Sequence, residues 1–124
     1  MLKSLSHWQN KRIHILGVGG TLMGAFAIFL KKHGIIVTGS DQNLYPPMSD
    51  QLGNNQVKVF TPYSAKNLDD ANPDLVVVGN VIRATNEEML EVTKRNIPFL
   101  SLPSALEEAI LPQKHSVVIA GTHG

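Results

Sequence analysis

The sequence contains no cysteine and no excess of charge of either sign. Its 11 lysines and arginines nearly balance its 10 acidic residues, which gives a net charge of +1. Without cysteine, a disulfide framework, a thiolate metal site and a thiol nucleophile are excluded. Without a dense basic run, the chain has no electrostatic footprint for nucleic acid. These absences fit a protein of the reducing cytoplasm and give no indication of a nucleic-acid partner.

Long hydrophobic runs are also missing. The longest, Leu22–Leu30, has about half of the ~20 residues that a membrane-spanning helix needs. The amino-terminal stretch "MLKSLSHWQNKR" is too polar for the core of a signal peptide. We therefore expect a cytoplasmic protein with no membrane partner. Its 124 residues, 43% of them hydrophobic and 17% charged, suffice for one domain with its own core.

Short β-branched runs alternate with helical segments after this polar leader. The predicted strands span residues 12–18, 35–41, 57–60, 74–80, 97–101 and 114–120. The predicted helical segments span residues 21–34, capped by Thr21 and ending at Gly34, then 47–52, 64–68, 86–96, capped by Asn86, and 102–111. In the segment 86–96 the apolar side is formed by Met89, Leu90 and Val92. This alternation predicts an α/β fold, with an open, mostly parallel sheet and helices on both faces. A linker around Pro112 divides the chain into residues 1–112 and 113–124.

A glycine-rich turn, "GVGGTLMG", joins the first predicted strand to the first helix. Gly17, Gly19 and Gly20 allow a sharp turn and a close approach of the backbone to a ligand. The N–H groups at the helix start suit a phosphate or pyrophosphate. The match to G-x-G-x-x-G is imperfect, because Leu22 stands at the third glycine and Gly24 falls two residues late. A tight structural turn, with Gly24 for close helix packing, remains the alternative.

Two polar residues end other predicted strands at the same edge of the sheet. Asp41 could accept two hydrogen bonds from a ribose, with Ser40 and Asn43 as flanking donors. The amide of Asn80 could read a donor and an acceptor on a nucleobase. A solvated turn residue at Asp41 and a simple turn cap at Asn80 remain open.

The remaining titratable residues predict no catalytic centre. The histidines show no metal-ligand spacing, so we expect no metal site and structural or solvated roles for His7, His14, His33 and His115. We expect the glutamates to lie on solvated faces: Glu87, Glu88, Glu107 and Glu108. No nucleophile–base pair is apparent.

Four stretches together, "IHILGVGGTLMG", "VTGSDQNLYPPMS", "DLVVVGNVI" and "IAGTHG", resemble the amino-terminal domain of the Mur ligases. Members of this family form amide bonds in peptidoglycan precursors and use ATP and Mg²⁺. The resemblance implies a Rossmann-like domain that binds UDP-N-acetylmuramate rather than NAD. The implied diphosphate donors are the backbone N–H groups of Gly19, Gly20, Thr21 and Leu22, and Gly17 and Ser40 are also expected in the UDP-sugar site. Asp41, with Gln42 or Asn43, would lie near the uridine, and Asn80 would line the same crevice.

The resemblance also assigns the last residues. Gly121, Thr122, His123 and Gly124 would be part of the ATP phosphate loop of a central domain, so residues 1–124 would bind the UDP part without catalysing ligation. The stretch "SDQNLYPPMS" favours the members that join L-alanyl-γ-D-glutamyl-meso-diaminopimelate in peptidoglycan recycling. Members that use L-alanine remain an alternative. An NAD(P)-binding domain of a dehydrogenase or regulator, and a non-catalytic interaction module, also stay open.

Overall fold

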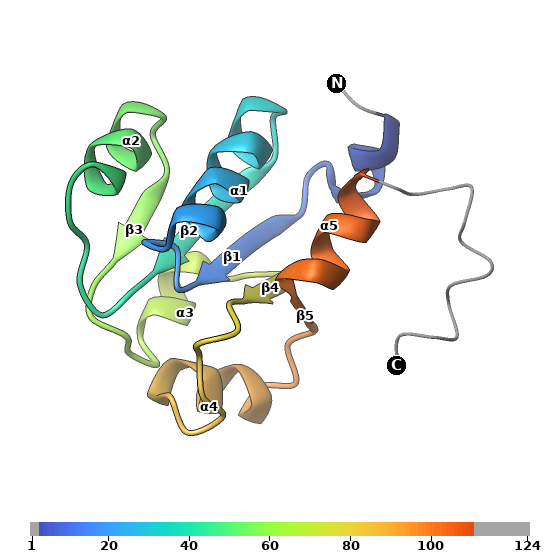
Figure 1. The fold of residues 1–124 in the computed structure, drawn as a ribbon. Coiled ribbons are helices and arrows are strands. Elements are labelled where there is room, and N and C mark those ends of the chain that lie inside the picture. Colours follow the sequence, from blue (N-terminus) through green and yellow to red (C-terminus); the bar gives the residue numbers. More distant parts are fainter. Residues whose placement is uncertain (1–2, 111–124) are drawn as a thin grey trace.

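A five-stranded parallel sheet with helices on both faces forms the fold (Figure 1). The computed structural model describes residues 3–110. Its strands are β1 (Arg12–Leu16), β2 (Ile36–Ser40), β3 (Lys58–Phe60), β4 (Leu75–Val78) and β5 (Phe99–Ser101). Its helices are a 3₁₀ helix (Lys3–Trp8), α1 (Thr21–Lys32), α2 (Met48–Asn54), α3 (Asn67–Ala71), α4 (Glu87–Lys94) and α5 (Leu102–Ile110). The predicted α/β fold is confirmed. The predicted strand at 114–120, the linker and the boundary at 112 lie outside the described residues.

The strand order is β3-β2-β1-β4-β5, and every neighbouring pair is parallel. Alternation along β1 divides the core in two, because successive side chains of a strand point to opposite faces. Ile13 and Ile15 pack in a cluster that includes residues of α1, α2 and α5. Leu16 packs on the other face, in a cluster with residues of α3 and α4. Figure 1 shows the same division, with α1, α2 and α5 above the sheet and α3 and α4 below. Within residues 3–110, no helix is long and apolar enough to cross a membrane.

Local details differ from the sequence predictions in three places. The N-cap of α1 is Gly20 and not Thr21, and it makes no side-chain cap hydrogen bond. Leu90 of α4 is 54% exposed, so it does not belong to the apolar side of that helix. The polar leader contains the 3₁₀ helix, which contacts α5 and buries Leu5 and Trp8. The predicted cap Asn86 is confirmed, since its side chain accepts hydrogen bonds from the N–H groups of the next helical turn.

Two glycines allow close packing beside the glycine-rich turn. A Cβ atom at Gly39 of β2 would stand 2.6 Å from Val18 Cβ. A Cβ atom at Gly24 of α1 would overlap the end of the Met48 side chain and stand 2.9 Å from the Val18 carbonyl oxygen. Gly24 therefore has the packing role that the sequence left open. Gly39 thus brings β2 against the turn, and Gly24 brings α1 against Met48 of α2.

Glu88 is completely buried, and its predicted place on a solvated face is wrong. It lies four residues before the buried Val92, so both side chains face the sheet. One carboxylate oxygen accepts from His14 Nε2 at 2.6 Å and from the Ser40 hydroxyl at 2.7 Å. The other oxygen accepts from the Asn67 side chain at 2.7 Å. His14, Ser40, Asn67 and Glu88 are called the Glu88 cluster below.

The Glu88 cluster supplies hydrogen bonds to a carboxylate whose burial would otherwise cost free energy. Because a carboxylate can only accept, His14 Nε2 is the donor to Glu88, and His14 Nδ1 lies 2.7 Å from Thr38 Oγ1. Burial alone would raise the pKa of the Glu88 carboxyl. Hydrogen bonds from His14, Asn67 and Ser40 outweigh that effect and hold the pKa below its ordinary value of 4.5. The expectation of a structural role for His14 agrees with its complete burial.

The close approach of Gly39 to Val18 predicts that a side chain at position 39 destabilises the fold. Gly39→Ala places a methyl group against Val18 Cβ, a branched carbon that cannot rotate away, and should lower the free energy of unfolding by about 1–3 kcal/mol. Gly53→Ala is the matched control, because nothing lies within 4 Å of its added Cβ and alanine favours a helix. Urea unfolding followed by circular dichroism measures both. Equal stability of the two variants would contradict the close approach.

The Glu88 cluster predicts a pH dependence of stability. Because the pKa of Glu88 is lowered on folding, its contribution is complete above the unfolded value of 4.5 and is lost as the pH falls through the lower, folded value. Glu88→Gln should lower the free energy of unfolding at neutral pH by about 1–3 kcal/mol. Urea unfolding measures both proteins between about pH 7 and about pH 3. The difference in free energy of unfolding between wild type and Glu88→Gln should become smaller as the pH falls. A gap that stays constant or widens would show that the buried carboxyl is not ionised.

Candidate functional site

The glycine-rich turn lies between β1 and α1, at the carboxyl edge of the sheet, where ligands bind in open α/β folds. The end of β2 holds it from the side. The Ser40 carbonyl oxygen accepts from Gly17 N at 2.8 Å and from Val18 N at 3.2 Å. Gly17 has φ +88°, a conformation that side chains other than glycine rarely adopt. The turn is therefore shaped by its glycines and by its contact with β2.

Asp41 binds the turn directly. Its Oδ2 accepts from Gly19 N at 2.8 Å, and its Oδ1 accepts from Gln42 N at 2.7 Å. A Cβ atom at Gly19 would stand 2.8 Å from Asp41 Oδ2, so only glycine allows this approach. The structure thus gives Asp41 a structural partner that the sequence did not predict. Its hydrogen bonds to a ribose stay a prediction.

Tyr63, in the loop after β3, lies near Asp41 and was not predicted as a site residue from the sequence. Burial and the nearby negative charges of Asp41 and Glu88 raise the pKa of Tyr63, so its hydroxyl stays protonated. The oxygen also lies 3.8 Å from where a Cβ of Gly17 would stand. Its position at the carboxyl end of a parallel strand is the signal that could have indicated it.

The predicted N–H donors fall into two groups, those that already have a hydrogen-bond partner and those that have none among the described residues. Gly19 N donates to Asp41, and Gly20 N donates to the Gly17 carbonyl at 3.1 Å, so both already have partners. Among the described residues, no acceptor is bonded to the N–H groups of Thr21, Leu22 or Met23. Three donors at the positive end of a helix dipole suit an anion. Met23 was not among the predicted donors.

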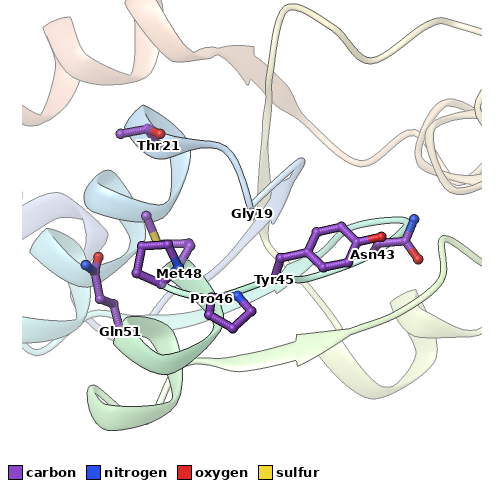
Figure 2. A pocket seen from close by; sticks show the side chains of 8 residues that line it. Gly19, Thr21, Asn43, Tyr45, Pro46, Met48 and Gln51 are labelled. Carbon is purple, nitrogen blue, oxygen red and sulfur yellow. The ribbon is translucent and has the colours of Figure 1, made fainter.

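A hollow of about 300 Å³ adjoins this helix start. It is lined by Gly19, Thr21, Asn43, Tyr45, Pro46, Pro47, Met48 and Gln51. In the view of Figure 2, the Tyr45 ring extends toward Asn43, while Met48 and Gln51 lie on the other side of Gly19. Tyr45 is 68% exposed, so its ring face is available to a ligand. The sequence predicted Gly19, Thr21 and Asn43 here and missed Tyr45 and Gln51, although "YPPM" follows β2 at the same edge.

The other predicted site residues are placed as follows. Asn80 is exposed just after β4, and Gly79 N donates to the Leu16 carbonyl oxygen at 3.2 Å, so the ends of β1 and β4 adjoin. Gln42 is also exposed. Ser40 is completely buried, and its hydroxyl donates to Glu88 instead of facing a ligand, contrary to expectation. Residues 121–124 lie outside the described part of the chain. Within residues 3–110, no three His, Asp or Glu side chains are grouped to hold a metal ion.

Comparisons with known proteins agree on one family. Residues 12–114 match the family described as Mur ligase family, catalytic domain. The chain is 42% identical over 113 residues to the UDP-N-acetylmuramate–L-alanyl-γ-D-glutamyl-meso-2,6-diaminoheptandioate ligase of Escherichia coli K12, covering 91% of this chain and 24% of that protein. It is 36% identical over 120 residues to a UDP-N-acetylmuramate–L-alanine ligase of Buchnera aphidicola, covering 97% and 24%. The chain therefore spans about a quarter of the length of these relatives.

Solved structures give the same result. The murein peptide ligase of Psychrobacter arcticus superposes with a TM-score of 0.77 at 40% identity, over 82% of this chain and 21% of that one. The UDP-N-acetylmuramate–alanine ligase of Thermotoga maritima superposes with a TM-score of 0.76 at 27% identity, over 85% and 24%. The Rossmann-like fold that the resemblance implied is thus shared with these enzymes. The match over residues 12–114 and these identities show that the chain belongs to the Mur ligase family.

Proposed function

We propose that this chain binds UDP-N-acetylmuramate as part of a Mur ligase that joins this nucleotide sugar to L-alanyl-γ-D-glutamyl-meso-diaminopimelate. One observation carries the proposal: ligases named for these two substrates are 42% and 40% identical to the chain over more than nine-tenths of its length. Relatives named for L-alanine are between 31% and 37% identical to the chain. The peptide is therefore the favoured acceptor, and L-alanine is the alternative.

The geometry of the helix start supports a diphosphate. The free N–H groups of Thr21, Leu22 and Met23 can each donate to a phosphate oxygen, and the α1 dipole favours the negative charge. No acid side chain caps these donors, because the N-cap is Gly20. We place the diphosphate on these three groups, which revises the predicted set by removing Gly19 and Gly20 and adding Met23.

The adjoining hollow supports the uridine. Tyr45 offers an exposed ring on which a base can stack, and the amides of Asn43 and Gln51 line the same hollow. Amides pair with the mixed donors and acceptors of a base edge. We place the base in this hollow, with Asp41 and Gln42 between it and the glycine-rich turn. Asn80, at the end of β4, stays a proposed part of the same crevice.

The role proposed for residues 3–110 is to bind and orient the nucleotide sugar. Mur ligases use ATP and Mg²⁺ for bond formation. For these residues we propose substrate binding and no step of phosphoryl transfer. We propose that residues 1–124 bind substrate without ligating it, in a cytoplasmic enzyme of peptidoglycan recycling.

Calorimetric titration of the chain tests the ligand class. We expect UDP-N-acetylmuramate to bind, UDP to compete with it, and NADH to bind more weakly or not at all. Tighter binding of NADH would support a dinucleotide-binding domain instead. Absence of binding to both nucleotides would support an interaction module.

The proposed diphosphate contact predicts the effect of one proline. Thr21→Pro removes one donor N–H while leaving α1 intact, because proline is tolerated at the first helical position. Gly20, with φ −72° and ψ 153°, already has the extended conformation that a residue before proline requires. We expect the affinity for UDP-N-acetylmuramate to fall about tenfold, as for a lost hydrogen bond to a charged group.

Thr21→Ala is the matched control, because it removes the side chain and keeps the N–H group. Its affinity should stay within about twofold of wild type if the threonine hydroxyl makes no contact. Circular dichroism verifies that both variants keep their helices. Unchanged binding by Thr21→Pro would place the diphosphate elsewhere.

A further inference from the structure

The Glu88 carboxylate binds two chain segments at once. Its Oε2 accepts from the hydroxyl of Ser40, the last residue of β2. Its Oε1 accepts from the backbone N–H of Ser64 at 3.2 Å and from the Asn67 side chain at 2.7 Å. With His14 on Oε2, both oxygens accept two hydrogen bonds, which uses the acceptor capacity of a carboxylate. Glu88 therefore joins the end of β2 to the loop that follows β3.

Both segments reach the turn within one residue of their contact with Glu88. Beside Ser40 stands Asp41, whose carboxylate accepts from Gly19 N at 2.8 Å. Beside Ser64 stands Tyr63, whose hydroxyl lies against the turn, 3.8 Å from where a Cβ of Gly17 would stand. Asp41 and Tyr63 are thus each held by the same buried acid, through a neighbouring residue of the chain.

A carboxylate is a costly choice for this core position. Met89 and Val92 of the same helix are buried in the apolar cluster on this face of the sheet, so an apolar side chain would suit the packing. Burial of an ion carries a desolvation cost of several kcal/mol, which only a complete set of hydrogen bonds offsets. Buried polar groups of this kind specify one arrangement of the segments that they join.

We propose that Glu88 is a positioning residue for the substrate site, and that it holds Asp41 and Tyr63 where they fix the Gly19 N–H group and the shape of the turn. The effect on substrate binding rests on the proposed function, in which a diphosphate binds at the start of α1. Glu88 touches no ligand in this account. It acts through Ser40 and Ser64 on the two residues that touch the turn.

The variant Glu88→Gln tests this with little change of volume. A glutamine has one acceptor oxygen and one NH₂ group, so one of the two segments loses its acceptor. Val92→Ala is the matched control, because Val92 lies one turn later in α4, is completely buried, and makes none of these hydrogen bonds. Ser40→Ala is a second variant, for use if Glu88→Gln does not fold. It keeps the Glu88 carboxylate and removes the Ser40 hydroxyl, which donates to Glu88 and also lies 3.0 Å from His14 Nε2.

The first measurement needs no ligand. Amide hydrogen exchange followed by NMR reports the bond from Gly19 N–H to Asp41, and a β4 amide serves as the internal reference. We expect Gly19 to exchange about tenfold faster in Glu88→Gln or Ser40→Ala than in wild type, and to keep its wild-type rate in Val92→Ala. An unchanged Gly19 rate in both cluster variants would overturn the proposal.

The second measurement is calorimetric titration with UDP-N-acetylmuramate. We expect the affinity to fall about tenfold in Glu88→Gln and to stay within about twofold of wild type in Val92→Ala. Equal losses in the two variants would show that only core stability matters, and would overturn the positioning role. If wild type itself does not bind this ligand, the proposed function fails, and the Gly19 exchange rate alone decides whether Glu88 positions the turn.

Discussion

The hydrogen bond from the Gly19 N–H group to the Asp41 carboxylate is the contact on which the site depends. It exists because β1 and β2 are adjacent parallel strands, so their carboxyl ends and the residues after them meet at one edge. Because the Gly19 N–H group already donates to Asp41, it is not available to a ligand. The N–H groups that can bind an anion are those of the first residues of α1. The sheet topology thus decides which donors remain for a ligand.

The fold could be predicted from the sequence because its signals are local. The alternation of apolar strands with helical segments indicated the parallel sheet, and Asn86 was recognisable as a helix cap. Thr21 was mistaken for a cap because a threonine often serves as one, whereas here Gly20 has the extended backbone of the N-cap. The 3₁₀ helix was missed because its apolar residues, Leu5 and Trp8, stand in an otherwise polar stretch.

The site could be predicted only in outline, because its details depend on contacts between distant residues. The glycine-rich turn, Asp41 and Asn80 were assigned to one edge by topology, and the structure places them there. The hydrogen-bond partner of Asp41 in the turn, Gly19, lies 22 residues earlier in the chain. Glu88 was assigned to solvent because acids are rarely buried, and only its spacing from Val92 indicated otherwise. Its hydrogen-bond donors come from three segments far away in the sequence.

The central claim is that the diphosphate of UDP-N-acetylmuramate binds at the start of α1 while the hydrogen bond from Gly19 N to Asp41 stays intact. An NMR titration of the ¹⁵N-labelled chain with this ligand tests it most directly. The account predicts the largest amide shifts at Thr21, Leu22 and Met23, with the Gly19 N–H group still protected from exchange. Shifts confined to other edges of the sheet, or release of Gly19 from Asp41 on binding, would contradict it.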